Sequence, residues 1–243
     1  MAYLLSVCVI FFSWDIIQNP YSTLQWTMVW LTLYLITICI LISINSVNYN
    51  VLLYLGCLVF MGFILVVAFL TEHVLIFYIC FESTLVPMFF MVLGWGARNQ
   101  KMRAAFYLFF FTLISSLMML LGLVKLYFLT GTLHLSELRS LEVPFYYQKW
   151  LFLSFILAFG VKIPLFPFHI WLPQAHVEAP LAGSVLLAGI LLKLGGYGII
   201  AIAYSLYPLC FLYYGPVLQW VSLIGVIYGG LTTIRQSDAK RLI

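Results

Sequence analysis

The feature that most constrains the fold is a series of long apolar runs that follow one another along the chain. A bilayer core of about 30 Å takes roughly 20 apolar residues as a helix, because lipid offers no partner for free backbone N–H and C=O groups. We expect about seven such helices. They are placed at Trp26–Ser43, Val51–Leu70, Val74–Gly94, Ala104–Leu129, Trp150–Trp171, Leu181–Tyr207 and Cys210–Ile234.

The composition excludes a water-soluble protein. Of the 243 residues, 65% are hydrophobic and 7% are charged, whereas a soluble domain carries about 25% charged residues. So few charges cannot coat a soluble globule, which excludes a soluble enzyme, a nucleic-acid-binding protein and a disordered linker. The runs also lack the period-two alternation of barrel strands. We therefore predict an all-α fold, a single polytopic transmembrane helical bundle over residues 1–243, with the lipid bilayer as its surroundings.

Two features outside the main runs complete this prediction. The segment Ala2–Phe12 is too short to cross a bilayer alone, so we expect an interfacial helix or a remnant of a span. The five cysteines stand singly, without the spacing of a metal site or a disulfide framework, and are predicted to act as small hydrophobic residues.

Basic residues gather in two short segments between and after the runs. They lie at Arg98–Arg103 and at Arg235–Arg241. An even number of predicted spans separates the two segments, so both lie on one face of the membrane. The positive-inside rule places that face on the matrix or cytoplasmic side.

One predicted span is interrupted. Within Trp150–Trp171, Pro164 and Pro167 closely follow Lys162. Two prolines three residues apart remove backbone donors and force a break or a wide kink, so we predict a discontinuous helix. Broken helices at membrane depth occur where the freed backbone lines protein or a watery cavity, the usual setting of ion sites in transporters.

Three ionisable residues lie near the middle of predicted spans: Glu82, Lys162 and Lys193. Together they oppose insertion by up to about 10 kcal/mol unless they pair or face water. Glu82 and one lysine could form a buried ion pair that only fixes the packing. One acid with two bases leaves a lysine over, and an unpaired buried lysine readily loses its proton because desolvation disfavours the charged form. We predict a proton relay through these three residues.

The surroundings of the relay follow from helical spacing. Gly189 and Gly196 lie four before and three after Lys193, so on an α-helix all three share a face that lets another helix approach. We therefore expect Lys193 to face protein. Hydroxyls stand in the middle of another span and could hold bridging water or bond a neighbouring helix. They belong to Thr112, Ser115 and Ser116.

Two histidines and a glutamate follow the prolines: His169, His176 and Glu178. Their spacing matches no common zinc pattern, and we predict no metal site. Titration near neutral pH favours proton uptake or a lateral relay, while anchoring of an interfacial loop is the simpler alternative. Without a glycine-rich phosphate loop after a strand, we expect no cofactor-binding site. Glu72, His73 and the stretch from His134 to Lys149 are predicted to be solvated loops, and Lys125 is expected to snorkel to the interface.

Three segments resemble one known family. They are Phe81–Pro87, Val161–Pro180 and Leu191–Gly198. They are similar to the NADH-ubiquinone oxidoreductase chain 4 family, antiporter-like proton-pumping membrane subunits of respiratory complex I, from about Leu70 to the last residue. The resemblance implies that Glu82 is the family's essential glutamate, that Lys162 is the lysine at its broken helix, and that Lys193 is the lysine of the next helix. In the family, the first two act as a pair that changes when quinone is reduced elsewhere in the complex.

The resemblance also implies partners, cofactors and a location. The partners would be other membrane subunits of complex I, and NAD, FMN, iron–sulfur clusters and ubiquinone would be bound elsewhere in that complex. We expect a multi-pass protein of the mitochondrial inner membrane, with a bacterial plasma membrane as the alternative. The family continues beyond Ile243 into a second inverted bundle, so we expect this chain to be about half a subunit. A cation/proton antiporter or membrane hydrogenase subunit is the alternative function, and a structural scaffold is a third.

Overall fold

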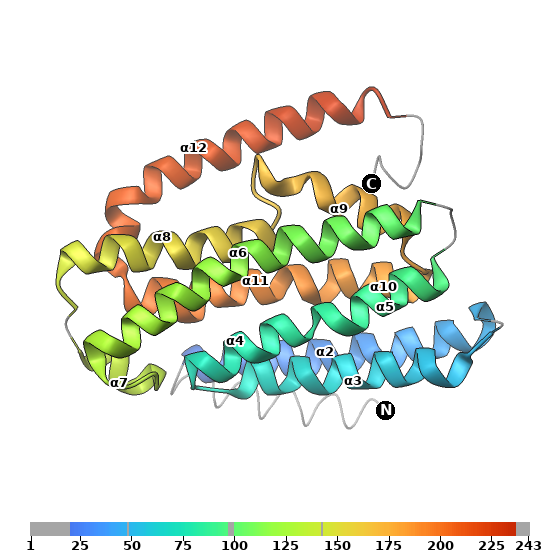
Figure 1. Ribbon diagram of the computed structural model, residues 1–243, viewed down its shortest axis with the longest axis horizontal. Helices are drawn as coiled ribbons and strands as arrows, with labels where there is room; N and C mark the ends of the chain where they lie inside the picture. The colour runs from blue at the N-terminus through green and yellow to red at the C-terminus, as the bar shows by residue number, and fades with distance from the viewer. Residues whose placement is uncertain (1–19, 48, 97–99, 142, 237–243) are drawn as a thin grey trace.

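The computed structural model describes residues 20–47, 49–96, 100–141 and 143–236, and within these ranges the chain is built from helices (Figure 1). The prediction of an all-α fold is confirmed. The elements are α2 (Pro20–Ser46), α3 (Val51–Leu70), α4 (Val74–Ser83), α5 (Leu85–Trp95), α6 (Lys101–Thr130), α7 (Leu135–Ser140), α8 (Phe145–Lys162), the 3-10 turn η1 (Phe168–Ile170), α9 (Trp171–Glu178), α10 (Leu181–Leu186), the π-helical η2 (Leu187–Leu191), α11 (Leu192–Gly198), the π-helical η3 (Ile199–Tyr204) and α12 (Pro208–Thr233).

Six helical segments of the described chain are long and apolar enough to cross a membrane. They agree within a few residues with six of the predicted spans: Thr23–Ile44, Val51–Leu70, Val74–Trp95, Lys101–Thr130, Leu181–Tyr204 and Pro208–Thr233. The remaining prediction, Trp150–Trp171, corresponds to α8, a turn, η1 and α9. The prediction for Ala2–Phe12 falls outside the described residues.

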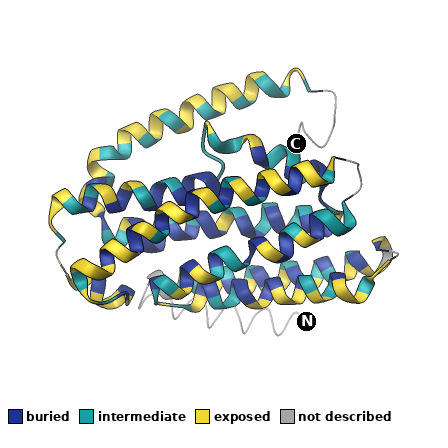
Figure 2. Cartoon of the chain, viewed as in Figure 1, coloured by how far each residue is buried: buried dark blue, intermediate teal, exposed yellow. Residues whose placement is uncertain are grey.

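The surface of the bundle is apolar, as a membrane protein requires. Leu52 is 85% exposed and Phe128 is 80% exposed, although large aliphatic and aromatic side chains are usually buried in soluble proteins. The interior holds methionine and phenylalanine side chains such as Met61 and Phe159. Figure 2 shows the buried residues along the inner helices, whereas α12 is exposed over most of its length. The polytopic bundle is therefore confirmed.

The described parts of both predicted basic segments lie at one end of the bundle. In Figure 1 the carboxyl end of α5, the start of α6 and the carboxyl end of α12 lie at the same end of the long axis. The described parts of these segments include Arg103 and Arg235. The predicted common face agrees with this arrangement.

The stretch from His134 to Lys149 differs from the solvated loop that we expected. It contains α7, whose Leu135 and Leu138 are buried, and the first residues of α8. Its start pairs with the connection before α4, where the Leu135 N–H donates to the Glu72 carbonyl at 2.9 Å. Burial of this apolar pair stabilises the short helix at the end of the bundle opposite the basic segments (Figure 1).

Candidate functional site

The predicted helix break lies directly after Lys162, the last residue of α8. Pro164 and Pro167 have no backbone N–H, so they cannot continue the ladder of α-helical hydrogen bonds. The Leu165 N–H instead donates to the Gly160 carbonyl at 2.8 Å, closing a wider turn. The chain resumes as η1 and α9, so the second half of the discontinuous helix extends to Glu178, beyond the predicted Trp171.

Trp171 packs at the break and binds a backbone carbonyl there. Its indole N–H donates to the carbonyl of Val161 at 3.0 Å, and the side chain is 3% exposed. Leu165 bonds Gly160 instead of Val161, so the indole supplies the Val161 carbonyl with a partner. Gly195 of α11 packs on the other side, where a Cβ would lie 2.8 Å from Ile163 Cγ1 and 3.4 Å from Lys162 Cβ.

Lys162 is buried at 3% exposure and points at the junction between α4 and α5. Its Nζ donates to the carbonyl of Phe81 at 3.0 Å and to the hydroxyl of Thr84 at 3.3 Å. The ammonium also lies 3.7 Å from the centroid of the Phe81 ring, a cation–π geometry. Sequence analysis missed both residues as site residues. The only available signal was that they flank Glu82 within one helical turn.

Glu82 lies at the carboxyl end of α4 and is half-buried. Its carboxylate interacts with the Ser116 hydroxyl of α6 and, through charge, with Lys162. Among the described residues, its Oε1 has no hydrogen-bond partner although it is buried. The fold thus brings the predicted acid close enough to the lysine of the broken helix for their charges to interact. The hydrogen bonds of Lys162, however, run to Phe81 and Thr84.

Within the described chain, Lys193 does not lie on the protein-facing side of its helix that Gly189 occupies, as helical spacing had led us to expect. It is exposed within the described chain, and its Nζ donates to the carbonyl of Ala188 at 2.9 Å. The helix is not a regular α-helix here, because η2 precedes Lys193 and π-helical bonding inserts a residue per turn. Gly189 therefore packs against Leu35 of α2, whereas a Cβ on Gly196 would meet nothing within 4 Å.

The three hydroxyls of α6 bond to their own helix. Thr112 donates to the Leu108 carbonyl at 2.6 Å, and Ser115 and Ser116 donate to carbonyls three residues earlier. These hydrogen bonds therefore lie within α6 rather than between helices. Ser116 also interacts with the side chains of Tyr78 and Glu82, which makes it the member of this group nearest to the candidate relay.

The two histidines lie on different elements. His169 is in η1, with its ring 5.4 Å from that of Tyr228 on α12, and His176 is in α9. His169 lies within the predicted span Trp150–Trp171, whereas His176 was predicted to follow that span, and both belong to the second half of the broken helix. Among the described residues, no group of three histidine, cysteine or acidic side chains could hold a metal ion.

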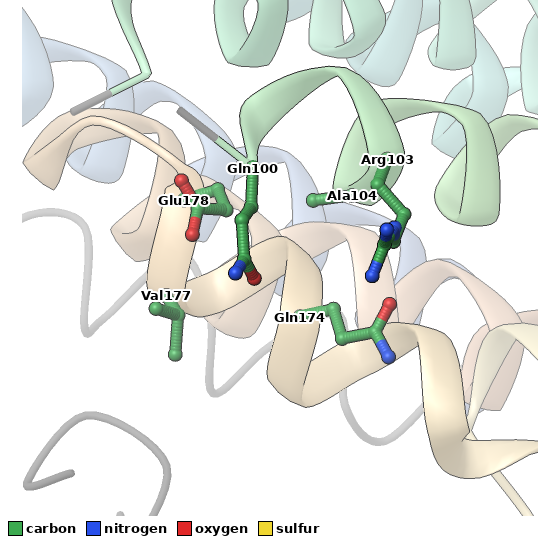
Figure 3. A pocket seen from close by; sticks show the side chains of 6 residues that line it. All are labelled: Gln100, Arg103, Ala104, Gln174, Val177 and Glu178. Atoms are coloured by element: carbon green, nitrogen blue, oxygen red, sulfur yellow. The ribbon is translucent and has the colours of Figure 1, made fainter. Parts of the chain in front are cut away.

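Glu178 closes α9 and lines a polar cavity of about 170 Å³ at the basic end of the bundle. Figure 3 shows its carboxylate beside Gln100, with Arg103 and Gln174 at the other side of the cavity. Glu178 is 4% exposed. Its Oε2 and the Oε1 of Gln174 have no hydrogen-bond partner among the described residues. A polar cavity of this size has room for several waters.

Relatives of the chain are found by sequence and by structure. It is 50% identical over 213 residues to a protein of Metridium senile named NADH-ubiquinone oxidoreductase chain 4, covering 88% of this chain and 43% of that protein. A protein of the same name from Chondrus crispus is 45% identical over 241 residues, with coverages of 96% and 49%. The chain thus spans about half the length of the curated relatives that it matches.

Solved structures of membrane complexes also contain chains similar to this one. A chain of "Respiratory complex I from Thermus thermophilus with bound NADH" matches with a TM-score of 0.79 and 30% identity, over 92% of this chain and 46% of that one. A chain of an archaeal membrane-bound sulfane sulfur reductase shares the fold, with a TM-score of 0.76 and 21% identity over 90% and 37%. The family described as "NADH:quinone oxidoreductase/Mrp antiporter, TM" matches residues 71–243. The match covers more than half of the sequence, so the chain belongs to this family of transmembrane NADH:quinone oxidoreductase and Mrp antiporter proteins.

Proposed function

We propose that the chain is a proton-translocating membrane component of respiratory complex I. Protons would pass through Glu82 and Lys162 to Lys193, driven by electron transfer from NADH to ubiquinone in other subunits. The observation that carries the proposal is the placement of Lys162. A buried lysine at the break of a discontinuous helix, within the electrostatic reach of Glu82, is the arrangement that proton relays in membranes use.

The chemistry follows from the charge of the pair. A carboxylate close to Lys162 favours its protonated form, and moving that carboxylate away favours release of the proton. A change of the distance between α4 and the end of α8 would therefore load and unload the lysine. The two residues lie on separate elements, so such a change needs no unfolding of either helix.

Proton uptake is assigned to the cavity at the basic end of the bundle. Glu178 is its buried acid, and α9 connects it to Trp171 beside the helix break. His169 and His176 are the titratable side chains of the same half-helix. Lys193 is the onward carrier, and its exposed position leaves the ammonium open to a further protein element.

The redox cofactors belong to other subunits in this proposal. NAD, FMN, iron–sulfur clusters and ubiquinone carry the electrons there, and this chain contributes proton movement alone. Its partners are other membrane subunits of the complex. The location is the mitochondrial inner membrane, because the chain is a multi-pass helical protein and its relatives of this name come from eukaryotes. These relatives also favour complex I over a separate cation/proton antiporter.

The test replaces Lys162 with Met in the assembled complex. Inner-membrane vesicles are supplied with NADH, and proton uptake is followed with a fluorescent pH-gradient dye while NADH oxidation is measured in parallel. We expect Lys162→Met to abolish or sharply reduce proton uptake, because methionine matches the lysine stem but carries no proton. Lys125→Met is the matched control, since Lys125 is exposed and its Nζ lies 5.3 Å from the centroid of the Tyr147 ring, outside the candidate relay.

Wild-type pumping by the Lys162→Met complex would remove this residue from the relay and leave a scaffold role. A sodium-dependent transport defect without any loss of NADH-driven pumping would instead favour the antiporter function. The amount of assembled complex on native gels is measured for each variant, so that a failure of assembly is not read as a failure of transport.

A further inference from the structure

The hydrogen-bond acceptors that hold the Lys162 ammonium contain no carboxylate. Its hydrogen bonds within the described chain run to the Phe81 carbonyl and the Thr84 hydroxyl, and its Nζ lies 3.7 Å from the centroid of the Phe81 ring. Glu82 stands between these two residues in sequence, yet its Oε1 has no hydrogen-bond partner within the described chain. The lysine is therefore held by neutral groups while its counter-ion lies nearby.

The hydroxyl of Thr84 is oriented to accept from the lysine. It donates its own hydrogen to the Phe81 carbonyl at 2.8 Å, which leaves its lone pairs free for Nζ. Thr84 is fully buried, so water does not compete for this hydroxyl. The Phe81 carbonyl accepts from both Thr84 and Lys162, and the three groups form one closed cluster.

The position of this cluster in the chain is also specific. Thr84 is the residue at which α4 ends and α5 begins, so the cluster lies at the junction of these two helices. The interruption of the helix places backbone and side-chain acceptors opposite the carboxyl end of α8. A regular helix would direct its carbonyls along its own axis toward the following turn.

The empty space beside Lys162 is small. The cavity beside Lys162, which is also lined by Thr112 and Trp171, measures about 10 Å³. A cavity must exceed roughly that volume to hold a single water. The acceptors that the described chain offers to the protonated lysine besides Glu82 are therefore the Phe81 carbonyl and the Thr84 hydroxyl.

We propose that Phe81 and Thr84 form a second holding site for the Lys162 ammonium, which keeps the lysine charged and in place while its pairing with Glu82 is broken. The inference rests on the proposed function, because it supplies the second of the two positions that a loading and unloading cycle needs. The charged group that faces Lys162 in the described structure is Glu82. Phe81 and Thr84 are positioning residues, since they act through the lysine.

The experiment uses the assembled complex in membrane vesicles. Thr84→Val keeps the shape of the side chain and removes the hydroxyl, and Thr84→Ser restores the hydroxyl. We expect NADH-driven proton uptake to fall by roughly tenfold in Thr84→Val, as fits the loss of one hydrogen bond to a charged group, and to stay near wild type in Thr84→Ser. Thr32→Val is the matched control, because Thr32 is equally buried and donates to the carbonyl three residues before it but touches no lysine.

A second variant tests the ring. Phe81→Leu removes the cation–π contact and keeps an apolar side chain, and we expect a smaller fall in proton uptake than in Thr84→Val. Phe77→Leu is its control, since Phe77 is also buried on α4 but the ring beneath the Lys162 ammonium is that of Phe81. If the Thr84→Val complex does not assemble, proton uptake by Phe81→Leu relative to Phe77→Leu tests the holding site instead.

The outcomes separate the inference from the proposed function. Normal uptake in Thr84→Val and Phe81→Leu, together with loss of uptake in Lys162→Met, overturns the holding site alone. Normal uptake in Lys162→Met overturns both. An equal fall in Thr84→Val, Thr84→Ser and Thr32→Val also overturns the holding site, because it shows a general effect of altered packing. A fall in Thr84→Val with recovery in Thr84→Ser supports it.

Discussion

At the scale of single residues, the central question is how a lysine is kept inside an apolar bundle. A charge at the centre of a membrane helix costs about 2.5 to 3.5 kcal/mol on insertion scales. Hydrogen bonds to a charged group contribute about 1.5 to 3 kcal/mol each. The bonds of Lys162 to the Phe81 carbonyl and the Thr84 hydroxyl are therefore enough to offset the cost without a direct ion pair.

Trp171 gives a prediction at the same scale. Trp171→Phe keeps an aromatic ring but removes the indole N–H that bonds the Val161 carbonyl. A buried carbonyl without its partner costs about 1 to 3 kcal/mol, so we expect a lower midpoint temperature of thermal unfolding for the complex in detergent. Trp150→Phe is the control, because the Trp150 side chain is 66% exposed. Equal midpoints for the two variants would refute this role of Trp171.

The sequence identified the residues whose charge is costly to bury in a membrane helix, but not the residues that they contact. Glu82, Lys162 and Lys193 stand out because a charge in an apolar run is expensive wherever it lies. Phe81 and Thr84 carry no such signal, since a phenylalanine and a threonine are ordinary in a membrane helix. Their role depends on the distance between two helices that are far apart in the chain, and periodicity within one helix cannot supply that distance.

At the scale of elements, the sequence predicts the helix break at the two prolines but not the π-helical segments. Pro164 and Pro167 lack a donor, and the break after Lys162 follows from that covalent fact. The π-helical segments before and after α11 have no such marker. They shift the register of the helix, so the spacing rule that placed Lys193 on the face of Gly189 failed.

Gly195 provides the prediction for the element scale. Its backbone lies against Ile163 and the Phe159 carbonyl at the end of α8, so a methyl group there pushes α11 away from the break. Gly195→Ala should destabilise the bundle by about 1 to 3 kcal/mol, the usual cost of overpacking, and lower the thermal midpoint. Gly196→Ala meets open space and shares the same gain in helix propensity, so it should leave the midpoint unchanged or raise it. A lower midpoint for Gly196→Ala than for Gly195→Ala would contradict this packing argument.

At the scale of the whole molecule, the broken helix decides the topology. Both α8 and α9 pack against α6, so the two halves together run along that long helix. They therefore count as one crossing, although neither half is among the segments that are long and apolar enough to cross alone. With α6, α10 to η3 and α12, this gives an even number of crossings between the two basic segments.

Cysteine labelling tests this count in the intact complex. In a background without the five native cysteines, we introduce Gln100→Cys before α6, Gln236→Cys after α12 and Tyr146→Cys at the start of α8. A membrane-impermeant maleimide is applied to mitoplasts and to inside-out vesicles. We expect the first two positions to react only in inside-out vesicles, because basic segments remain on the matrix side, and Tyr146→Cys to react only in mitoplasts. Reaction of Gln100→Cys and Gln236→Cys from opposite faces would mean that the broken helix does not cross the membrane, and Lys162 would then lack the transmembrane position that a relay requires.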